Sequence, residues 1–501
     1  TLAGMNCGFG RTRETGTKGI YNVVFTYTEE KVGVFAAKAA VKIVEALIAG
    51  KSYDLEADIQ EMREIREAER LGPSTGSIVE EAKQRDIPYI RLNRHSLVQL
   101  GYGVNQKRIR ATISSETSNI AVDLACDKEE TKNLLGRAGV PVPDGRIIRD
   151  EKDLDWVVKK LGYPLVIKPV DGNHGKGATI NITKLEEAKL AFASARKFSR
   201  RVIVEKYITG FDFRLLVIDH KFVAAAKRTP ACVVGDGKST IQKLIDRVNE
   251  DPRRGYGHEN VLTEINVDQM TERILKSLKL TLKTIVPKDE ILYLKTTANL
   301  STGGTSQDVT HKVHPYNVFM AERVSRVIGL DICGLDIMAL DLEVPINENG
   351  GAVLEVNAAP GFRMHLDPTD GLPINVAEPV IDMLYPAGTT TRIPIVAVTG
   401  TNGKTTTVRL ISHIMKNVGK KVGYTTSDGI YIQNRMLEKG DCSGPKSTEF
   451  VLMDPTVDFA VLECARGGLL RAGLGFNQCD VAVVTNVTPD HLGLQDINTV
   501  E

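Results

Sequence analysis

Residues 162–180 of the sequence, GYPLVIKPVDGNHGKGATI, decide how the fold of the first half is interpreted. An apolar run ends in Lys168 and Pro169, and the glycine-rich loop that follows carries a histidine and a second lysine. Because a new β-rich run starts at Ala178, the pattern predicts a strand, a cationic loop and a second strand. Glycines let backbone N–H groups approach an anion and lysine supplies a point charge, so the loop suits a triphosphate. No helix follows the glycines, which argues against a P-loop; an ordinary hairpin with a basic tip is the alternative.

Composition sets limits on the rest of the chain. Its 501 residues are enough for roughly three domains. The 64 Lys and Arg nearly balance the 63 Asp and Glu, which gives a net charge of +1 and favours neither nucleic-acid nor membrane binding. No apolar run has the length of a membrane span. The seven cysteines are scattered and form no C-x-x-C pair, so we expect reduced thiols in a cytoplasmic protein.

Residues 1–122 are expected to form an α+β domain. Its patterns predict a strand at 20–27, helices at 29–48 and 54–70, a third helix capped by Ser74 or Thr75, and a strand at 88–92. A basic cluster near its end is suited either to an acidic partner or to solvent. That cluster comprises Lys107, Arg108 and Arg110.

Two strands near the end of the next unit carry hard oxygen ligands. Residues 334–340 include Asp336, and residues 352–357 include Glu355 and Asn357. Alternation places Glu355 and Asn357 on one face of their strand, and if Asp336 lies opposite, the three suit Mg²⁺ bound together with ATP phosphates. Polar residues on an edge strand are the alternative. Two side chains that follow, Arg363 and His365, are expected to reach a substrate carboxylate.

The unit that holds these strands is expected to span residues 123–386. A helix at 129–138 follows Lys128, and a strand at 201–207 carries Glu205 near its end. Residues 212–218 and 221–226 predict a hairpin, and residues 229–330 read as an inserted, helix-rich lid. The lid carries a second glycine and hydroxyl loop at 299–304, which includes Ser301 and follows Lys295.

This unit resembles the ATP-grasp carboxylate–amine ligases, which phosphorylate a carboxylate and let an amine displace the phosphate. The resemblance implies that Lys128 and Lys168 hold the ATP phosphates, that Glu205 lies at the adenosine and that Arg363 contacts substrate. The glycine and hydroxyl loop adds Lys295 as an expected ATP contact and Ser301 as an expected substrate contact. The resemblance also implies magnesium ligation by Asp336, Glu355 and Asn357, and catalytic roles for Arg363 and His365. The loop that would close over the phosphates comprises Asn173, His174, Gly175, Lys176 and Gly177.

A second nucleotide site follows a linker at residues 387–392. The buried strand 395–398 leads into a glycine loop and then a helix expected from Thr407, which is P-loop geometry. The strict motif needs glycine where this chain has Val398, so only its second half is met. The loop comprises Gly400, Thr401, Asn402, Gly403, Lys404, Thr405 and Thr406.

The stretch GTNGKT resembles Mur-type peptide ligases. From the P-loop geometry, Lys404 binds the outer phosphates and acts in catalysis, and Thr405 ligates Mg²⁺; the resemblance assigns Glu463 and His491 to the metal as well. Residues 393–501 would then be a Mur-ligase-like domain that is incomplete at its C-terminus.

An ATP-grasp unit followed by a Mur-like unit is the order of the cyanophycin synthetase family, which the whole chain resembles. The expected fold class is α/β multidomain: an α+β N-terminal domain, an ATP-grasp fold and a P-loop Mur-ligase-like α/β domain. The family implies ATP, Mg²⁺, L-aspartate, L-arginine and a cyanophycin primer or polymer as ligands, and a homotetramer or homodimer. By this resemblance the polymer meets Arg466, Gly467, Gly468 and Arg471 in the second half.

Two rival hypotheses remain. A glutathione-type or other amino-acid ligase shares the ATP-grasp half but leaves the Mur-like half unexplained. A polymer-binding or regulatory protein with inactive nucleotide sites is the non-enzyme alternative, and the intact Lys168, Glu355, Asn357 and Lys404 argue against it.

Overall fold

The computed structural model describes residues 2–5, 7–15, 17–170, 177–255, 262–489, 492–493 and 499. The chain divides into two compact units, residues 1–72 with 91–97, and residues 73–90 with 98–501. No helix in the described ranges is long and apolar enough to cross a membrane.

The first unit is a hairpin with two helices. Strands β1 (Gly10–Glu14) and β2 (Tyr21–Phe25) pair antiparallel, and α1 (Glu30–Ile48) and α2 (Leu55–Glu69) follow. The predicted strand and both predicted helices are thereby confirmed. The Asp54 carboxylate caps α2 by accepting a bond from Ala57 N–H.

The second unit begins with helix α3 (Pro73–Gln84), and a four-stranded sheet of β3 to β6 follows. The expectation that Ser74 or Thr75 caps this helix was wrong, because the helix already begins at Pro73, whose fixed φ suits a first turn. The sheet comprises β3 (Tyr89–Arg91), β4 (Leu97–Leu100), β5 (Lys107–Arg110) and β6 (Ile113–Ser114).

Residues 98–106, which we call the brace segment, bond to the linker and to the last domain. Gly101 and Gly103 have positive φ, and a Cβ on Gly103 would lie 2.2 Å from the carbonyl oxygen of Val457. The buried Gln99 donates to the carbonyl of Leu452 at 3.1 Å. The other contacts are Val104 N–H to Val457 O, Asn105 Nδ2 to Arg392 O and the Tyr385 hydroxyl to Leu100 O, at 2.9, 2.8 and 2.7 Å.

A four-stranded sheet in the order β7-β10-β8-β9 carries the stretch that opened the sequence analysis. One face packs on α6 (Leu154–Leu161) and α7 (Leu185–Arg196) through a core that includes Ile167, Val202 and Val204. Alternation then places Lys168 and Glu205 on the opposite face. The strands are β7 (Gly145–Ile148), β8 (Leu165–Pro169), β9 (Thr179–Ile182) and β10 (Val202–Lys206).

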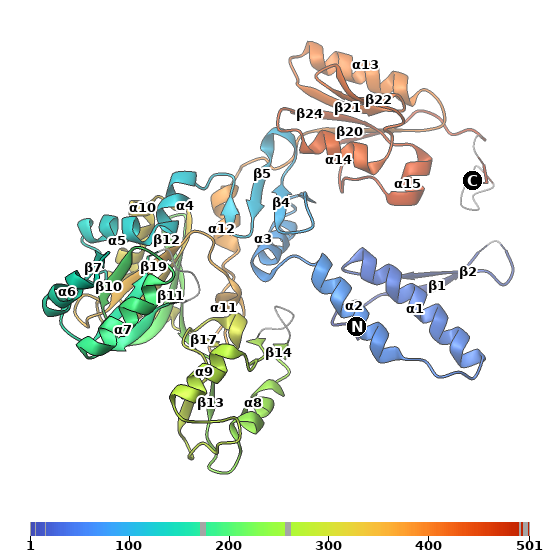
Figure 1. Cartoon of the computed structure of the whole chain (residues 1–501). Coiled ribbons are helices and arrows are strands. Elements are labelled where there is room, and N and C mark those ends of the chain that lie inside the picture. The colour runs from blue at the N-terminus through green and yellow to red at the C-terminus, as the bar shows by residue number, and fades with distance from the viewer. Residues whose placement is uncertain are drawn as a thin grey trace. The chain divides into compact units, whose positions relative to one another are not determined.

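A five-stranded sheet in the order β17-β12-β11-β18-β19 forms the second lobe (Figure 1). The predicted strands and hairpin are confirmed, and β19 has the predicted bounds. Its strands are β11 (Phe211–Ile218), β12 (Lys221–Thr229), β17 (Thr305–Asp308), β18 (Ile332–Ala339) and β19 (Ala352–Asn357). Helices α4 (Asn119–Cys126), α5 (Lys128–Arg137) and α10 (Pro315–Ile328) contribute to its core.

The segment inserted between β12 and β17 has a core of its own, with Leu244, Leu275 and Leu294 among its buried residues. It contains strands as well as helices, whereas the sequence suggested mainly helix. Helix α10, although expected in the lid, packs in the core of the five-stranded sheet. The inserted elements are α8 (Ile241–Asn249), α9 (Gln269–Ser277), β13 (Cys232–Val234), β14 (Arg254–Gly255), β15 (Leu262–Thr263), β16 (Ile291–Tyr293) and the 3-10 turn Leu300–Thr302.

The last domain is a six-stranded sheet in the order β23-β22-β21-β24-β20-β25. Strand β20 (Ile395–Thr399) runs parallel to both neighbours. Helix α13 begins at Lys404 rather than at the predicted Thr407, because Gly403 takes a left-handed conformation as its N-cap. The other elements are β21 (Val422–Thr426), β22 (Gly429–Ile432), β23 (Arg435–Lys439), β24 (Phe459–Glu463), β25 (Val481–Val484), α13 (Lys404–Asn417), α14 (Pro445–Met453) and α15 (Arg466–Ala472).

Two candidate nucleotide sites

Glu205 lies between two lysines on the open face of the four-stranded sheet. One carboxylate oxygen pairs with Lys168 at 2.8 Å and the other with Lys132 of α5. Burial alone would raise the pKa of Glu205, but Lys168 and Lys132 together lower it, so the group is an anion. Both of its oxygens are engaged, and the direct effect of Glu205 is to hold the Lys168 ammonium in place.

Asp336 lies between two buried guanidinium groups. It pairs with Arg214 of β11 and, at 3.2 Å, with Arg228 of β12. Arg228 also donates from Nε to Asp212 at 2.9 Å. Burial opposes ionisation of Asp336, yet the two arginines lower its pKa. Two guanidinium groups side by side are chemically suited to neutralise the charge of a phosphate or a carboxylate.

Strand pairing brings the predicted magnesium ligands together. In the β18–β19 register, Asp336 is opposite Glu355 and Gly334 is opposite Asn357. Glu355 also pairs with Lys128 at 3.4 Å, so the first residue of α5 joins the cluster. Two carboxylates and an amide oxygen fit the hard-oxygen preference of Mg²⁺, and the lysine fits a phosphate.

Arg363 and His365 lie on the short helix α11 (Arg363–Leu366). The Arg363 guanidinium donates to the Thr263 hydroxyl at 3.1 Å. His365 is 2% exposed, and its Nε2 has no hydrogen-bond partner among the residues that the structure describes. Burial, reinforced by Arg214 and Arg228, lowers the pKa of His365 to about 3. This burial argues against the predicted direct contact between His365 and a substrate carboxylate.

In the part of the chain that the structure describes, the other predicted residues of the first half make no contact with the cluster of Asp336, Glu355 and Lys128. The buried Lys295 ammonium pairs with Asp268 at 2.6 Å and donates to Thr271, so it belongs to the inserted segment. Ser301 is exposed on the 3-10 turn Leu300–Thr302. Gly177 has a positive φ, and the rest of its predicted loop, Asn173 to Lys176, lies outside the described residues.

The second site forms where β20 meets α13. Gly400 has φ +128°, and a Cβ there would lie 2.2 Å from the Thr485 hydroxyl, so only glycine fits. The Lys404 ammonium donates to the carbonyls of Gly400 and Thr401, both at 2.9 Å, and so lies over its own loop. A helix N-terminus beside a lysine is an arrangement that suits a phosphate, so binding of phosphate here stays a prediction. The remaining loop residues are Asn402, Gly403, Thr405 and Thr406.

A buried carboxylate faces this loop. The Thr405 hydroxyl donates to Glu463 at 2.8 Å, and the Ser427 N–H donates to the same oxygen at 3.1 Å. Glu463 is 2% exposed. A hydroxyl and a carboxylate beside a phosphate loop fit Mg²⁺. The predicted third ligand, His491, lies outside the described residues.

Helix α15 (Arg466–Ala472) begins three residues after the end of β24 at Glu463 and contains the residues predicted to meet polymer. Gly468 approaches the backbone of the neighbouring loop, since a Cβ there would lie 3.2 Å from Ser443 O. Contact of these residues with polymer stays a prediction. The predicted residues on this helix are Arg466, Gly467, Gly468 and Arg471.

Four residues that these contacts bring into the sites were missed from sequence. Arg214 and Arg228 interrupt two strands that are otherwise rich in apolar residues, and that interruption was a usable signal. Lys132 follows Lys128 by one helical turn on α5, so a position of the two side chains on the same face of the helix was foreseeable. Nothing local marked Ser427, because its proximity to Glu463 depends on parallel pairing of β21 with β24.

Three family models match the chain. A cyanophycin synthase-like N-terminal domain covers residues 1–49, a RimK-like ATP-grasp domain covers 125–243, and a Mur ligase middle domain covers 398–499. The predicted ATP-grasp and Mur-ligase-like fold classes are confirmed, and the two ligase domains imply use of ATP.

Curated relatives extend the match over the whole chain. A cyanophycin synthetase from Synechocystis sp. is 53% identical over 506 residues, which cover 100% of this chain and 58% of that protein. One from Trichormus variabilis is 52% identical over 504 residues, covering 100% and 56%. The chain therefore spans less than two thirds of these relatives, and the predicted resemblance is confirmed.

The first half has further relatives. A glutathione biosynthesis bifunctional protein from Clostridium perfringens is 31% identical over 325 residues, which cover 63% of this chain and 41% of that protein. The crystal structure of a bifunctional glutathione synthetase from Pasteurella multocida aligns with TM-score 0.51 and 28% identity, covering 69% of this chain and 49% of the other.

Proposed function

Because this chain is similar along its whole length to cyanophycin synthetases, we propose that it is part of a C–N ligase that makes cyanophycin, a polymer with an aspartate backbone and arginine branches. The ATP-grasp half adds L-aspartate to the end of the backbone. The Mur-like half adds L-arginine to the new β-carboxylate. The observation that carries the proposal is the match of one chain to both a RimK-like ATP-grasp domain and a Mur ligase middle domain.

In the first half, a carboxylate oxygen of the chain end attacks the γ-phosphorus of ATP, and ADP leaves. The amine of aspartate then attacks the acyl phosphate carbon, phosphate leaves, and the amine loses a proton. Lys128 and Lys168 hold the phosphates, and Arg214 and Arg228 neutralise charge beside them. Bound Mg²⁺ would supply further charge neutralisation at Asp336, Glu355 and Asn357.

In the second half, the same sequence of bond changes forms an isopeptide bond to arginine. The amides at the start of α13 and the Lys404 ammonium bind the phosphates of ATP. Thr405 and Glu463 would hold Mg²⁺ there. We also propose that Arg363 contacts the acceptor in the first site and that the predicted residues of α15 contact the polymer in the second.

The proposal also covers the domain bounds, the location and the assembly of the protein. We propose domains at residues 1–122, 123–386 and 393–501, with a linker at 387–392 between the last two. We propose that the protein acts in the cytoplasm, which its free cysteines support, and that it assembles as a dimer or tetramer.

Two substitutions test the division of labour in the full-length protein. Lys168→Ala should abolish ATP-dependent incorporation of labelled aspartate into a primer. Lys404→Ala should leave one round of aspartate addition intact and stop arginine addition. Absence of aspartate incorporation by the unaltered protein would overturn the substrate assignment, and equal loss of both activities in Lys404→Ala would overturn the division between the halves. Lys420→Ala, which changes an exposed lysine beyond the end of α13, is the control.

A further inference from the structure

A buried arginine lies where three pieces of the inserted segment meet. Arg254 of β14 is 9% exposed. Its guanidinium donates to two backbone carbonyls, that of Thr263 in β15 at 2.6 Å and that of Gly303 at 3.2 Å. Gly303 directly follows the 3-10 turn Leu300–Thr302, which carries the predicted substrate contact Ser301. One side chain therefore connects β14, β15 and that turn.

The turn is bonded within itself and packed against the residues after β15. Gly303 has φ +92°, and a Cβ there would lie 2.7 Å from Cγ1 of Ile265. The peptide N–H of Gly304 donates to the carbonyl of Asn299 at 3.1 Å and closes the turn. The turn is therefore a rigid unit, and the bond from Arg254 to its closing residue helps to set its position.

Thr263 links Arg254 to a second arginine, which is predicted to meet the acceptor. While its carbonyl accepts from Arg254, its hydroxyl accepts from the Arg363 guanidinium at 3.1 Å. Thr263 is 3% exposed, and a β-branched residue has few side-chain rotamers. A bond that fixes the peptide of Thr263 therefore also restricts the direction of its hydroxyl, which is the group that Arg363 contacts.

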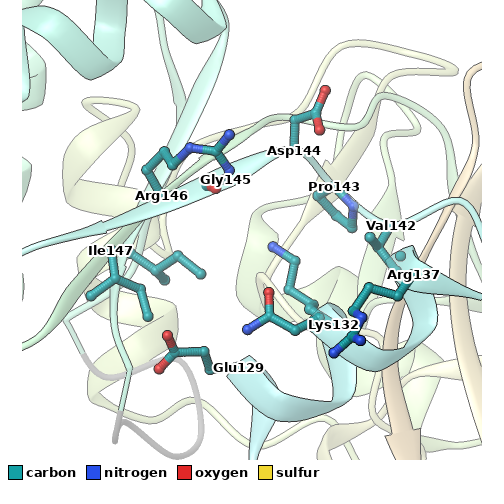
Figure 2. Close-up of a pocket in the computed structure, with 12 residues that line it drawn as sticks. Glu129, Lys132, Arg137, Val142, Pro143, Asp144, Gly145, Arg146 and Ile147 are labelled. Carbon is teal, nitrogen blue, oxygen red and sulfur yellow. Dashed lines mark hydrogen bonds between the residues drawn. The ribbon is translucent and has the colours of Figure 1, made fainter.

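The nucleotide side of the first site is made by other elements. Figure 2 shows Lys132 extending from α5 into the pocket between that helix and β7. Its ammonium pairs with Glu205, which also holds Lys168 at 2.8 Å. Among the described residues, none that lines this pocket belongs to the inserted segment. A change at Arg254 should therefore alter contacts with the acceptor and leave those with ATP intact.

We propose that Arg254 is a positioning residue for the acceptor of the first site. It holds the turn that carries Ser301 and, through Thr263, the guanidinium of Arg363, so that both face the carboxylate end of a peptide-like chain. A guanidinium binds a carboxylate through two parallel bonds, so its orientation affects affinity directly. Arginine suits the anchoring role, because one planar group reaches two carbonyls. The inference rests on the proposed function, because the role of Arg363 at the acceptor belongs to it.

The test compares variants of the full-length protein by calorimetry with a short primer that has an aspartate backbone and arginine branches. Arg254→Gln should weaken primer binding about tenfold, the effect of losing one hydrogen bond to a charged group. Thr263→Val, which removes only the hydroxyl, should do the same, and Thr263→Ser should retain the affinity. The double variant should lose less than the product of the two single losses, because both act through one contact. Arg247→Gln is the control, since it changes an arginine of the same segment that is 58% exposed.

Kinetics separate positioning from a general loss of structure. With aspartate incorporation as the assay, Arg254→Gln and Thr263→Val should each raise the apparent KM for primer about tenfold, with kcat unchanged. The dissociation constant of a non-hydrolysable ATP analogue should also be unchanged. It is measured with Lys404→Ala added, which removes ATP binding at the second site.

Primer binding that is absent in the unaltered protein, or unchanged in both Arg254→Gln and Thr263→Val, would overturn the proposal. An equal loss of ATP affinity would overturn it as well, because Arg254 would then only stabilise the inserted segment. If both variants weaken primer binding while the unaltered protein incorporates no aspartate, the positioning role stands and the assigned reaction fails.

Discussion

Replacement of Asp336 by asparagine should destabilise the five-stranded lobe as well as abolish aspartate addition. The carboxylate lies between Arg214 and Arg228, whose exposed fractions are 8% and 7%. Removal of one partner from a buried ion pair leaves uncompensated charge and costs about 3–5 kcal/mol. Arg228 keeps Asp212 as a partner, so we expect the lower end, about 3 kcal/mol.

Glu355→Gln is the matched comparison, because Glu355 is also a predicted magnesium ligand on the paired strand. Its contact with Lys128 is 3.4 Å long, and both side chains are about two fifths exposed. Such a pair contributes less than about 1 kcal/mol. Glu355→Gln should therefore lose activity with little loss of stability.

Hydrogen exchange of the β11 and β18 amides measures the local free energy of opening in both variants. Aspartate incorporation is measured in parallel. Equal stability of Asp336→Asn and the unaltered protein would show that the two arginines do not depend on Asp336. Equal destabilisation by both variants would refute the distinction between a buried and a partly exposed carboxylate.

Three further predictions follow from single contacts. Burial lowers the pKa of His365 from 6.5 to about 3, so the unfolded chain binds a proton at this residue more readily than the folded chain does. The free energy of unfolding should therefore fall as the pH drops from 6.5 toward 3, by up to about 1.4 kcal/mol per pH unit. His365→Gln should flatten this part of the pH profile of stability measured by urea unfolding, and an unchanged slope would contradict the burial argument. Gly103→Ala should loosen the brace segment and speed exchange of the Val104 amide, because its Cβ would meet Val457 O at 2.2 Å. Gly139→Ala should leave that exchange unchanged, because Gly139 also has a positive φ but its Cβ would meet no described atom within 4 Å beyond its own chain neighbours. Thr405→Val removes the hydroxyl that donates to Glu463 and should weaken ATP binding at the second site about tenfold. Thr405→Ser keeps a hydroxyl and should keep the ATP affinity, whereas full affinity in the valine variant would show that the hydroxyl takes no part in the site.

Local pattern predicted much of the fold. The β19 strand had the predicted bounds because its polar residues alternate with apolar ones and the tight turn after Asn357 ends it. The start of α13 was placed three residues late, because the left-handed conformation of Gly403 is a feature of the backbone and not of the residue pattern. Strand bounds inside the inserted segment were missed since its strands have only two or three residues.

The candidate sites were predictable where their residues follow one another along a strand or a loop. Glu355 and Asn357 are two residues apart, and Lys404 and Thr405 are adjacent. The bond from Arg214 to Asp336 joins residues 122 positions apart, so it depends on antiparallel pairing of β11 with β18. Lys295 shows the reverse, because closeness in sequence to a glycine loop suggested a nucleotide contact while its ammonium bonds within the inserted segment.

The brace segment limits how the chain can be divided for biochemical work. The carbonyls of Leu452 and Val457 in the last domain accept bonds from Gln99 and Val104, which lie some 350 residues earlier. A fragment that begins at residue 393 would expose those carbonyls and the surface that Gly103 covers. The second half is therefore better compared between full-length variants than as an excised domain, and any graft of it onto another ligase would need residues 98–106 as well.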